Sequence, residues 1–91
     1  MTPLKTQFRQ HGFHFNLLKR HGQIALLKKT SDAQVDSFEV VVIQQRKQTT
    51  MFNRMVEAHE AMPPSESWGT YGWSYNDEDR ANHKYRELSL R

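Results

Sequence analysis

The stretch from Trp68 to Tyr75 constrains the fold more than any other part of the chain. It places four of the ten aromatic residues within eight positions, separated by glycine, threonine and serine, and an acidic run over 76–79 follows at once. Side chains two apart in a strand point to the same face, so Tyr71, Trp73 and Tyr75 should form one aromatic row. The pattern predicts a strand that leads directly into a helix.

A C-terminal helix is expected after this strand. Asn76 suits an N-cap, and the acidic side chains that follow it complement the positive end of the helix dipole. Ala81, Tyr85 and Leu88 repeat at the i, i+4, i+7 spacing of one helix face. We expect this apolar stripe to lie across one face of the sheet.

Two segments near the N-terminus, 13–19 and 23–29, alternate as the strands of a β-hairpin do. His21-Gly22 between them suits a two-residue turn, because glycine accepts positive φ freely. This turn would place Leu17 opposite Leu26. One face of the hairpin would then carry five apolar side chains, Phe13, Phe15, Leu17, Ile24 and Leu26.

Residues 38–46 form the third predicted strand. Its run from Val40 to Ile43 is apolar on both faces, as in a central strand that is covered on both sides. Residues 1–11 carry few apolar side chains and are expected to form a flexible arm. The remainder, 12–91, should be a single α+β domain: a four-stranded antiparallel sheet in the order β-β-β-β-α, with the C-terminal helix on one face.

The segment before the prolines has a helical spacing of apolar side chains. Met51, Met55, Ala58 and Met62 recur at three- and four-residue intervals. This predicts a short amphipathic helix over 50–61, which Pro63-Pro64 would end.

Length and composition narrow the setting. Ninety-one residues make one domain, and the absence of cysteine removes disulfides and thiolate chemistry. Small secreted domains usually depend on disulfides, and the N-terminus lacks an apolar run of signal-peptide length, so a cytoplasmic location is expected.

No sequence motif points to catalysis or to a metal. Five histidines are present: His11, His14, His21, His59 and His83. His11 and His14 are three apart, but they fall at a strand entrance and not on a helix, where this spacing would aim both at one ion. No serine lies in a nucleophile elbow, and no glycine-rich phosphate loop is present. We therefore expect neither an enzyme nor a cofactor.

Three dibasic pairs stand at the ends of predicted strands: Lys19-Arg20, Lys28-Lys29 and Arg46-Lys47. With a net charge of +3, they could gather at the rim of the sheet and bind nucleic acid together with exposed aromatic rings. Alternatively, they protect the strand ends against edge-to-edge aggregation.

The segment from His59 to Tyr75 resembles a short protein family of tailed bacteriophages. The resemblance rests on the P-S-x-E/x-W-G-x-x-G-W-x-Y stretch, on the strand with the sequence FEVVVIQ, and on the pattern of the last helix. The family has no established activity, so it implies an origin and a bacterial cytoplasm but no catalytic residue. Its members run through residues 51–62 as an extended loop, which is the alternative to a helix there.

Three functional hypotheses follow. The first is a non-enzymatic protein that binds and inhibits or modulates a host macromolecule, such as a defence nuclease or a polymerase. Its contact surface would be Trp68, as a partly exposed ring, with the loop that precedes it: Met51, Phe52, Arg54 and Glu66, rimmed by Arg46 and Lys47. The second is a nucleic-acid-binding module that uses Lys19, Arg20, Lys28 and Lys29. The third is a homodimer that pairs through an exposed edge strand.

Overall fold

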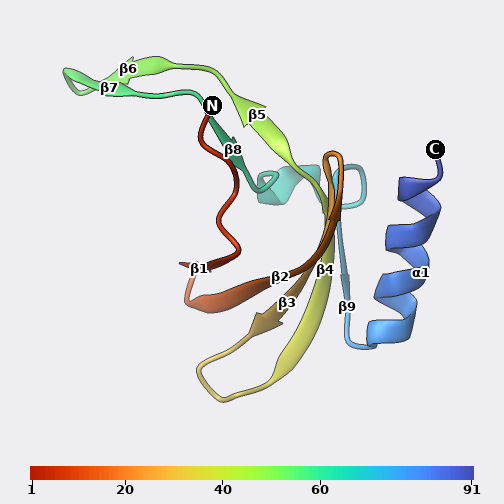
Figure 1. Ribbon diagram of the computed structural model, residues 1–91. Coiled ribbons are helices and arrows are strands. Elements are labelled where there is room, and N and C mark those ends of the chain that lie inside the picture. The colour runs from red at the N-terminus through yellow and green to blue at the C-terminus, as the bar shows by residue number, and fades with distance from the viewer.

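A five-stranded antiparallel sheet with one helix on its face makes up the body of the molecule (Figure 1). The computed structural model describes all residues from 1 to 91. The strands lie in the order β1 (Gln7–Gln10), β2 (Phe13–His21), β3 (Ile24–Thr30), β4 (Asp36–Val42) and β9 (Gly72–Tyr75). Helix α1 (Glu78–Ser89) packs against β3, β4 and β9. The predicted α+β architecture, an antiparallel sheet with a C-terminal helix on one face, is confirmed.

The N-terminal segment adds the fifth strand, and the expectation of a flexible arm over 1–11 is not what the structure shows. Residues 7–10 pair with 13–16, so β1 continues the sheet beyond β2. The Phe8 ring stacks on Phe15 with 5.1 Å between the ring centroids. Phe8 is the one aromatic side chain in a polar segment, so the sequence showed none of the apolar–polar alternation of a strand there. Its stacking on Phe15 attaches this edge strand to the core.

The first hairpin forms, but its two faces differ from the prediction. The turn is Gly22-Gln23, one residue later than expected, and the register shifts between Leu17 and Lys19 so that Leu17 pairs with Leu27. Because a slip of one residue turns a side chain to the opposite face, the five apolar side chains do not share one face. Phe13, Phe15 and Leu17 pack on one side of the sheet, whereas Ile24 and Leu26 pack under the helix.

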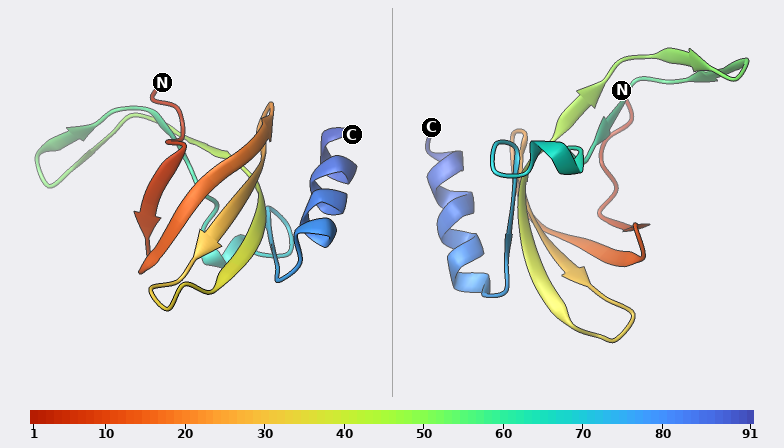
Figure 2. Two further views of the ribbon diagram at one scale, coloured as in Figure 1. Left: turned by 60° about the horizontal axis from the view of Figure 1, so that its bottom comes forward. Right: turned by 180° about the vertical axis from the view of Figure 1, so that it is seen from behind.

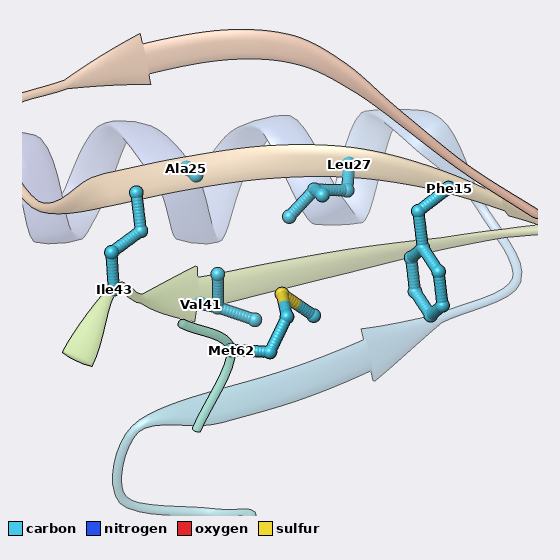
Figure 3. Close-up of a cluster of buried hydrophobic side chains, with 6 residues drawn as sticks. All are labelled: Phe15, Ala25, Leu27, Val41, Ile43 and Met62. Carbon is cyan, nitrogen blue, oxygen red and sulfur yellow. The ribbon is translucent and has the colours of Figure 1, made fainter. Parts of the chain in front are cut away.

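Each face of the sheet carries its own hydrophobic cluster. The face away from α1 holds Phe15, Ala25, Leu27, Val41, Ile43 and Met62, with Met62 reaching back over the strands (Figure 3). The helix covers Leu26 and Val40 with Ala81 and Leu88. Strand β4 therefore contributes to both clusters, as its two-sided apolar run predicted, and the helical stripe is confirmed.

The aromatic row is split. Trp73 and Tyr75 pack against the cluster under α1, and the Lys84 ammonium lies 4.4 Å from the centre of the Trp73 ring. Tyr71 lies in the turn before β9 and is 44% exposed, so it does not continue the row. The helix N-cap is Asp77, whose carboxylate accepts the Asp79 N–H at 2.9 Å, one residue after the predicted Asn76.

The predicted helix over 50–61 is wrong, because this region is built from short strands. Strands β5 (Gln44–Arg46) and β8 (His59–Ala61) pair with each other, and β6 (Thr49–Met51) pairs with β7 (Arg54–Val56). The methionine spacing fits a helix, but no other element lies where the apolar face of such a helix could pack. Residues 44–61, called the arm from here on, extend away from the sheet at the end opposite α1 (Figure 2). A one-turn 3-10 helix, η1 (Ser65–Ser67), follows.

No helix in the structure, the twelve-residue α1 included, is long and apolar enough to cross a membrane.

Candidate functional site

The outer half of the arm is a bare two-stranded ribbon. Every residue of β6 and β7 is exposed, and the two strands pair only with each other. A two-stranded hairpin without a hydrophobic face to bury is marginally stable in water. The chain therefore projects a segment that contributes little to its own core.

Phe52 stands at the tip of this ribbon and is 90% exposed. Phe52 and Asn53 both have positive φ, 51° and 61°, as the two central residues of a type I′ turn do. Asparagine tolerates this conformation, but a bulky aromatic residue adopts it rarely, at a cost of about 1–3 kcal/mol. The structure thus combines an exposed ring and an unfavourable backbone at one residue.

More apolar side chains surround the tip. Met51, Met55 and Val56 are 54%, 68% and 37% exposed. Met51 pairs with Arg54 and Thr50 with Met55, so Met51 and Val56 share one face of the ribbon and Met55 lies on the other. Apolar side chains are therefore offered on both faces, with the Phe52 ring between them.

The arm is also basic. Arg46, Lys47 and Arg54 are all exposed, and none of them takes part in the five ion pairs of the molecule. Their charges are therefore available to a partner.

The base of the arm is fixed to the body through Glu60 in β8. Its carboxylate oxygens accept hydrogen bonds from Arg20 Nη1 and Nη2 at 2.7 and 2.6 Å, and Oε1 also accepts from the Leu4 N–H at 2.9 Å. The hydrogen bonds from Arg20, followed by the one from Leu4, lower the pKa of Glu60 to about 2. Thr2 adds two backbone hydrogen bonds, to Ala58 and from Glu60. The exposed ribbon is thus attached to a base that is hydrogen-bonded to the body.

The surface predicted for a partner is divided between two places. Met51, Phe52, Arg54, Arg46 and Lys47 lie together on the arm. Trp68 is half-buried against the cluster of the sheet, where its indole N–H donates to Ser74 Oγ at 2.8 Å. Glu66 is exposed in η1, outside the arm.

Two of the three dibasic pairs, Lys19-Arg20 and Lys28-Lys29, make contacts within the molecule. Lys19 donates to Asn82, Arg20 pairs with Glu60, and Lys28 lies 3.3 Å from a carboxylate oxygen of Asp36. The Lys29 ammonium sits 4.0 Å from the centre of the Phe13 ring. The four residues of the nucleic-acid hypothesis therefore do not form one free basic patch.

The sequence named the apolar residues of the arm but not the shape that presents them. Thr49, Thr50 and Val56 are β-branched, and Asn53 is a preferred residue of hairpin turns. This was the available signal for a hairpin, and the helical spacing of the methionines obscured it.

Comparisons with protein-family models, with curated proteins and with solved structures found no match for this chain. No three histidine, aspartate or glutamate side chains come together in a way that could hold a metal ion.

Proposed function

We propose that this chain is a small, non-enzymatic phage-type protein that binds a host macromolecule through the arm and inhibits or modulates it. The observation that carries the proposal is Phe52, an aromatic ring left 90% exposed on a left-handed backbone at the end of a projecting ribbon. Unfavourable backbone conformations that persist in a fold cluster at binding and catalytic sites. A ring that stabilises nothing in its own molecule is suited to a pocket in another.

The side chains of the arm indicate what kind of surface the partner would present. Phe52, Met51 and Met55 would fill an apolar pocket, and flexible thioether side chains adapt to its shape. Arg54 beside the tip, with Arg46 and Lys47 further back, favours carboxylates around that pocket. Buried aromatic and arginine side chains contribute most of the binding energy in protein interfaces, and the arm offers both.

The resemblance of residues 59–75 to a bacteriophage family supports a bacterial setting for this interaction. The partner would then be a protein of the host cytoplasm, and blocking it would require one copy of the arm for each target.

The experiment is an affinity capture from bacterial lysates, before and after infection, with three forms of the purified protein. The wild-type chain should retain a host protein that Phe52→Asp fails to retain. Val35→Asp is the matched control, because Val35 is also an exposed apolar residue, 65% exposed, but lies in the turn between β3 and β4. Binding to the purified partner should then be measured for all three. Equal retention by wild type and Phe52→Asp would refute a role for the arm.

A second candidate is nucleic-acid binding by the same arm. Three cations without an ion pair lie on the arm, which ends in an aromatic ring, and apolar wedges on minor-groove-binding proteins insert between base steps. Binding to duplex DNA should then weaken with salt, and the log–log slope should drop by about 0.9 for each of Arg46, Lys47 and Arg54 replaced by alanine. A salt-independent signal, or an unchanged slope in the triple variant, would exclude it.

A further inference from the structure

A pocket of about 350 Å³ opens on the face of the sheet away from α1, apart from the arm. Phe13 and Phe15 line it from β2, and the segment that crosses the sheet after the arm covers it with Met62, the two prolines and Trp68. Figure 3 shows Phe15 at one end of the cluster and Met62 next to Val41. Aromatic rings on two sides make the pocket suited to a flat ligand.

The floor of this pocket holds the only buried charged side chain of the molecule, Glu39 in β4, which is 4% exposed. Glu39 takes part in no ion pair, and its one hydrogen bond comes from Ser74 Oγ to Oε2 at 2.8 Å. Since Ser74 Oγ accepts the indole N–H of Trp68, its own hydrogen is directed at Glu39. No group of the molecule donates to the second oxygen, Oε1, so the carboxylate can accept further hydrogen bonds.

One cation lines the same pocket without neutralising Glu39. Leu27 lies opposite Glu39 across the β3–β4 ladder, and Lys29 is two residues further along β3 on the same face. Its ammonium rests over the Phe13 ring instead of pairing with the carboxylate. The pocket thus presents an acceptor with free capacity and, at one side, a donor.

We propose that this pocket binds a guanine base. Guanine is flat and offers two adjacent donors, N1–H and the 2-amino group, which match a carboxylate, and its O6 acceptor lies next to them on the side where Lys29 can donate. Adenine would bring the N1 lone pair against Glu39, which repels it. A free nucleotide and an unpaired guanine in a single strand present the same edge, so the chemistry is shared by both sources.

The test is calorimetric titration of the whole protein with guanosine, inosine and adenosine 5′-monophosphates, and with guanosine-containing and guanosine-free tetranucleotides. We expect one saturable site for the guanine compounds, with adenosine monophosphate at least about tenfold weaker and inosine monophosphate in between. Binding by the guanosine tetranucleotide alone would assign the site to single-stranded nucleic acid. Binding by the mononucleotide would assign it to free nucleotides.

Variants separate the site from the fold. Glu39→Gln should weaken guanine binding by about tenfold or more, because the amide turns a donor toward N1–H and the 2-amino group. Glu78→Gln is the control, since this carboxylate is exposed at the start of α1, on the other face of the sheet from the pocket, and it should bind as wild type. If Glu39→Gln does not fold, an NMR titration of the wild-type protein tests the site. Guanosine monophosphate should shift the resonances of the Trp68 indole N–H and the Ser74 amide, and it should leave those of β6 and β7 unchanged.

Three results would overturn the proposal. They are the absence of saturable binding by any guanine compound up to roughly 1 mM, equal affinity for adenine and guanine, and resonance shifts confined to residues outside the pocket. Because the pocket and the arm share no residue, failure of this site leaves the proposed role of Phe52 untouched, and the reverse also holds.

Discussion

Arg20 and Glu60 form a two-point ion pair, with Nη1 and Nη2 of the guanidinium 2.7 and 2.6 Å from Oε1 and Oε2 of the carboxylate. Glu60 is mostly buried, with 11% of its side chain exposed, and it also accepts the Leu4 N–H. One carboxylate therefore joins the base of the arm, the second strand and the N-terminal segment. This junction therefore helps to fix the base of the arm on the body of the molecule.

The first prediction concerns pH. The pKa of Glu60 is lowered from 4.5 to about 2, first by the hydrogen bonds of Arg20 and then by that of Leu4. A carboxylate with a lowered pKa stabilises the fold above its unfolded value, and this stabilisation is lost as pH falls through the folded value. The free energy of unfolding should therefore fall between pH 4.5 and about 2, and Glu60→Gln should remove part of that dependence.

Urea denaturation at a series of pH values measures this dependence. Glu57→Gln is the control, because Glu57 is exposed on the arm and belongs to no ion pair. An NMR titration that gave Glu60 an ordinary pKa would contradict the prediction directly.

The second prediction concerns the backbone of the tip. Glycine adopts positive φ without the Cβ clash that alanine meets, so Phe52→Gly should give a more stable β6–β7 hairpin than Phe52→Ala by about 1 kcal/mol. Amide hydrogen exchange in the hairpin measures the difference, since the body of the protein should not change. Both variants should bind the partner equally weakly, because both lack the Phe52 ring. If alanine were as stable as glycine, the turn would not have the left-handed conformation described above.

The sequence predicted those elements whose burial is set by local pattern. The stripe of α1, the two-sided strand β4 and the strand that leads into α1 follow from the spacing of apolar side chains, and each is confirmed. The faces of the first hairpin could not be read in this way. They depend on a register shift near Leu17 and on a turn one residue later, which are set by packing on the sheet and not by propensity.

The arm shows the same limit for the candidate site. The methionine spacing was correct as a pattern, but an amphipathic helix forms only where its apolar face can be buried. Met51 and Phe52 were singled out as contact residues, whereas their position at the tip of a ribbon followed only from the structure. Trp68 was expected beside them. It packs instead on the sheet, because residues 62–68 lie against the face away from α1.

The third prediction separates the rings of the aromatic segment. Trp73 packs under α1 with Lys84 over its ring, so Trp73→Ala should lower the free energy of unfolding by about 3 kcal/mol. Tyr71 is 44% exposed in a turn, and Tyr71→Ala should change it by less than about 1 kcal/mol. Thermal or urea denaturation of both variants checks the contrast. Similar losses of unfolding free energy in the two variants would mean that Tyr71 belongs to the core.

The last prediction concerns the close approach of Trp68 to Gly72. A Cβ built on Gly72 would lie 2.6 Å from two atoms of the Trp68 ring, and Gly72 is buried. Gly72→Ala should therefore force the indole to move and cost about 1–3 kcal/mol of unfolding free energy. In a Trp68→Leu background the smaller side chain leaves room for the new methyl group, so the same substitution should cost at least about 0.5 kcal/mol less. A double-mutant cycle by urea denaturation measures this coupling. Strictly additive effects would mean that the ring does not lie against Gly72, and the wall that Trp68 contributes to the pocket would then have to be placed elsewhere.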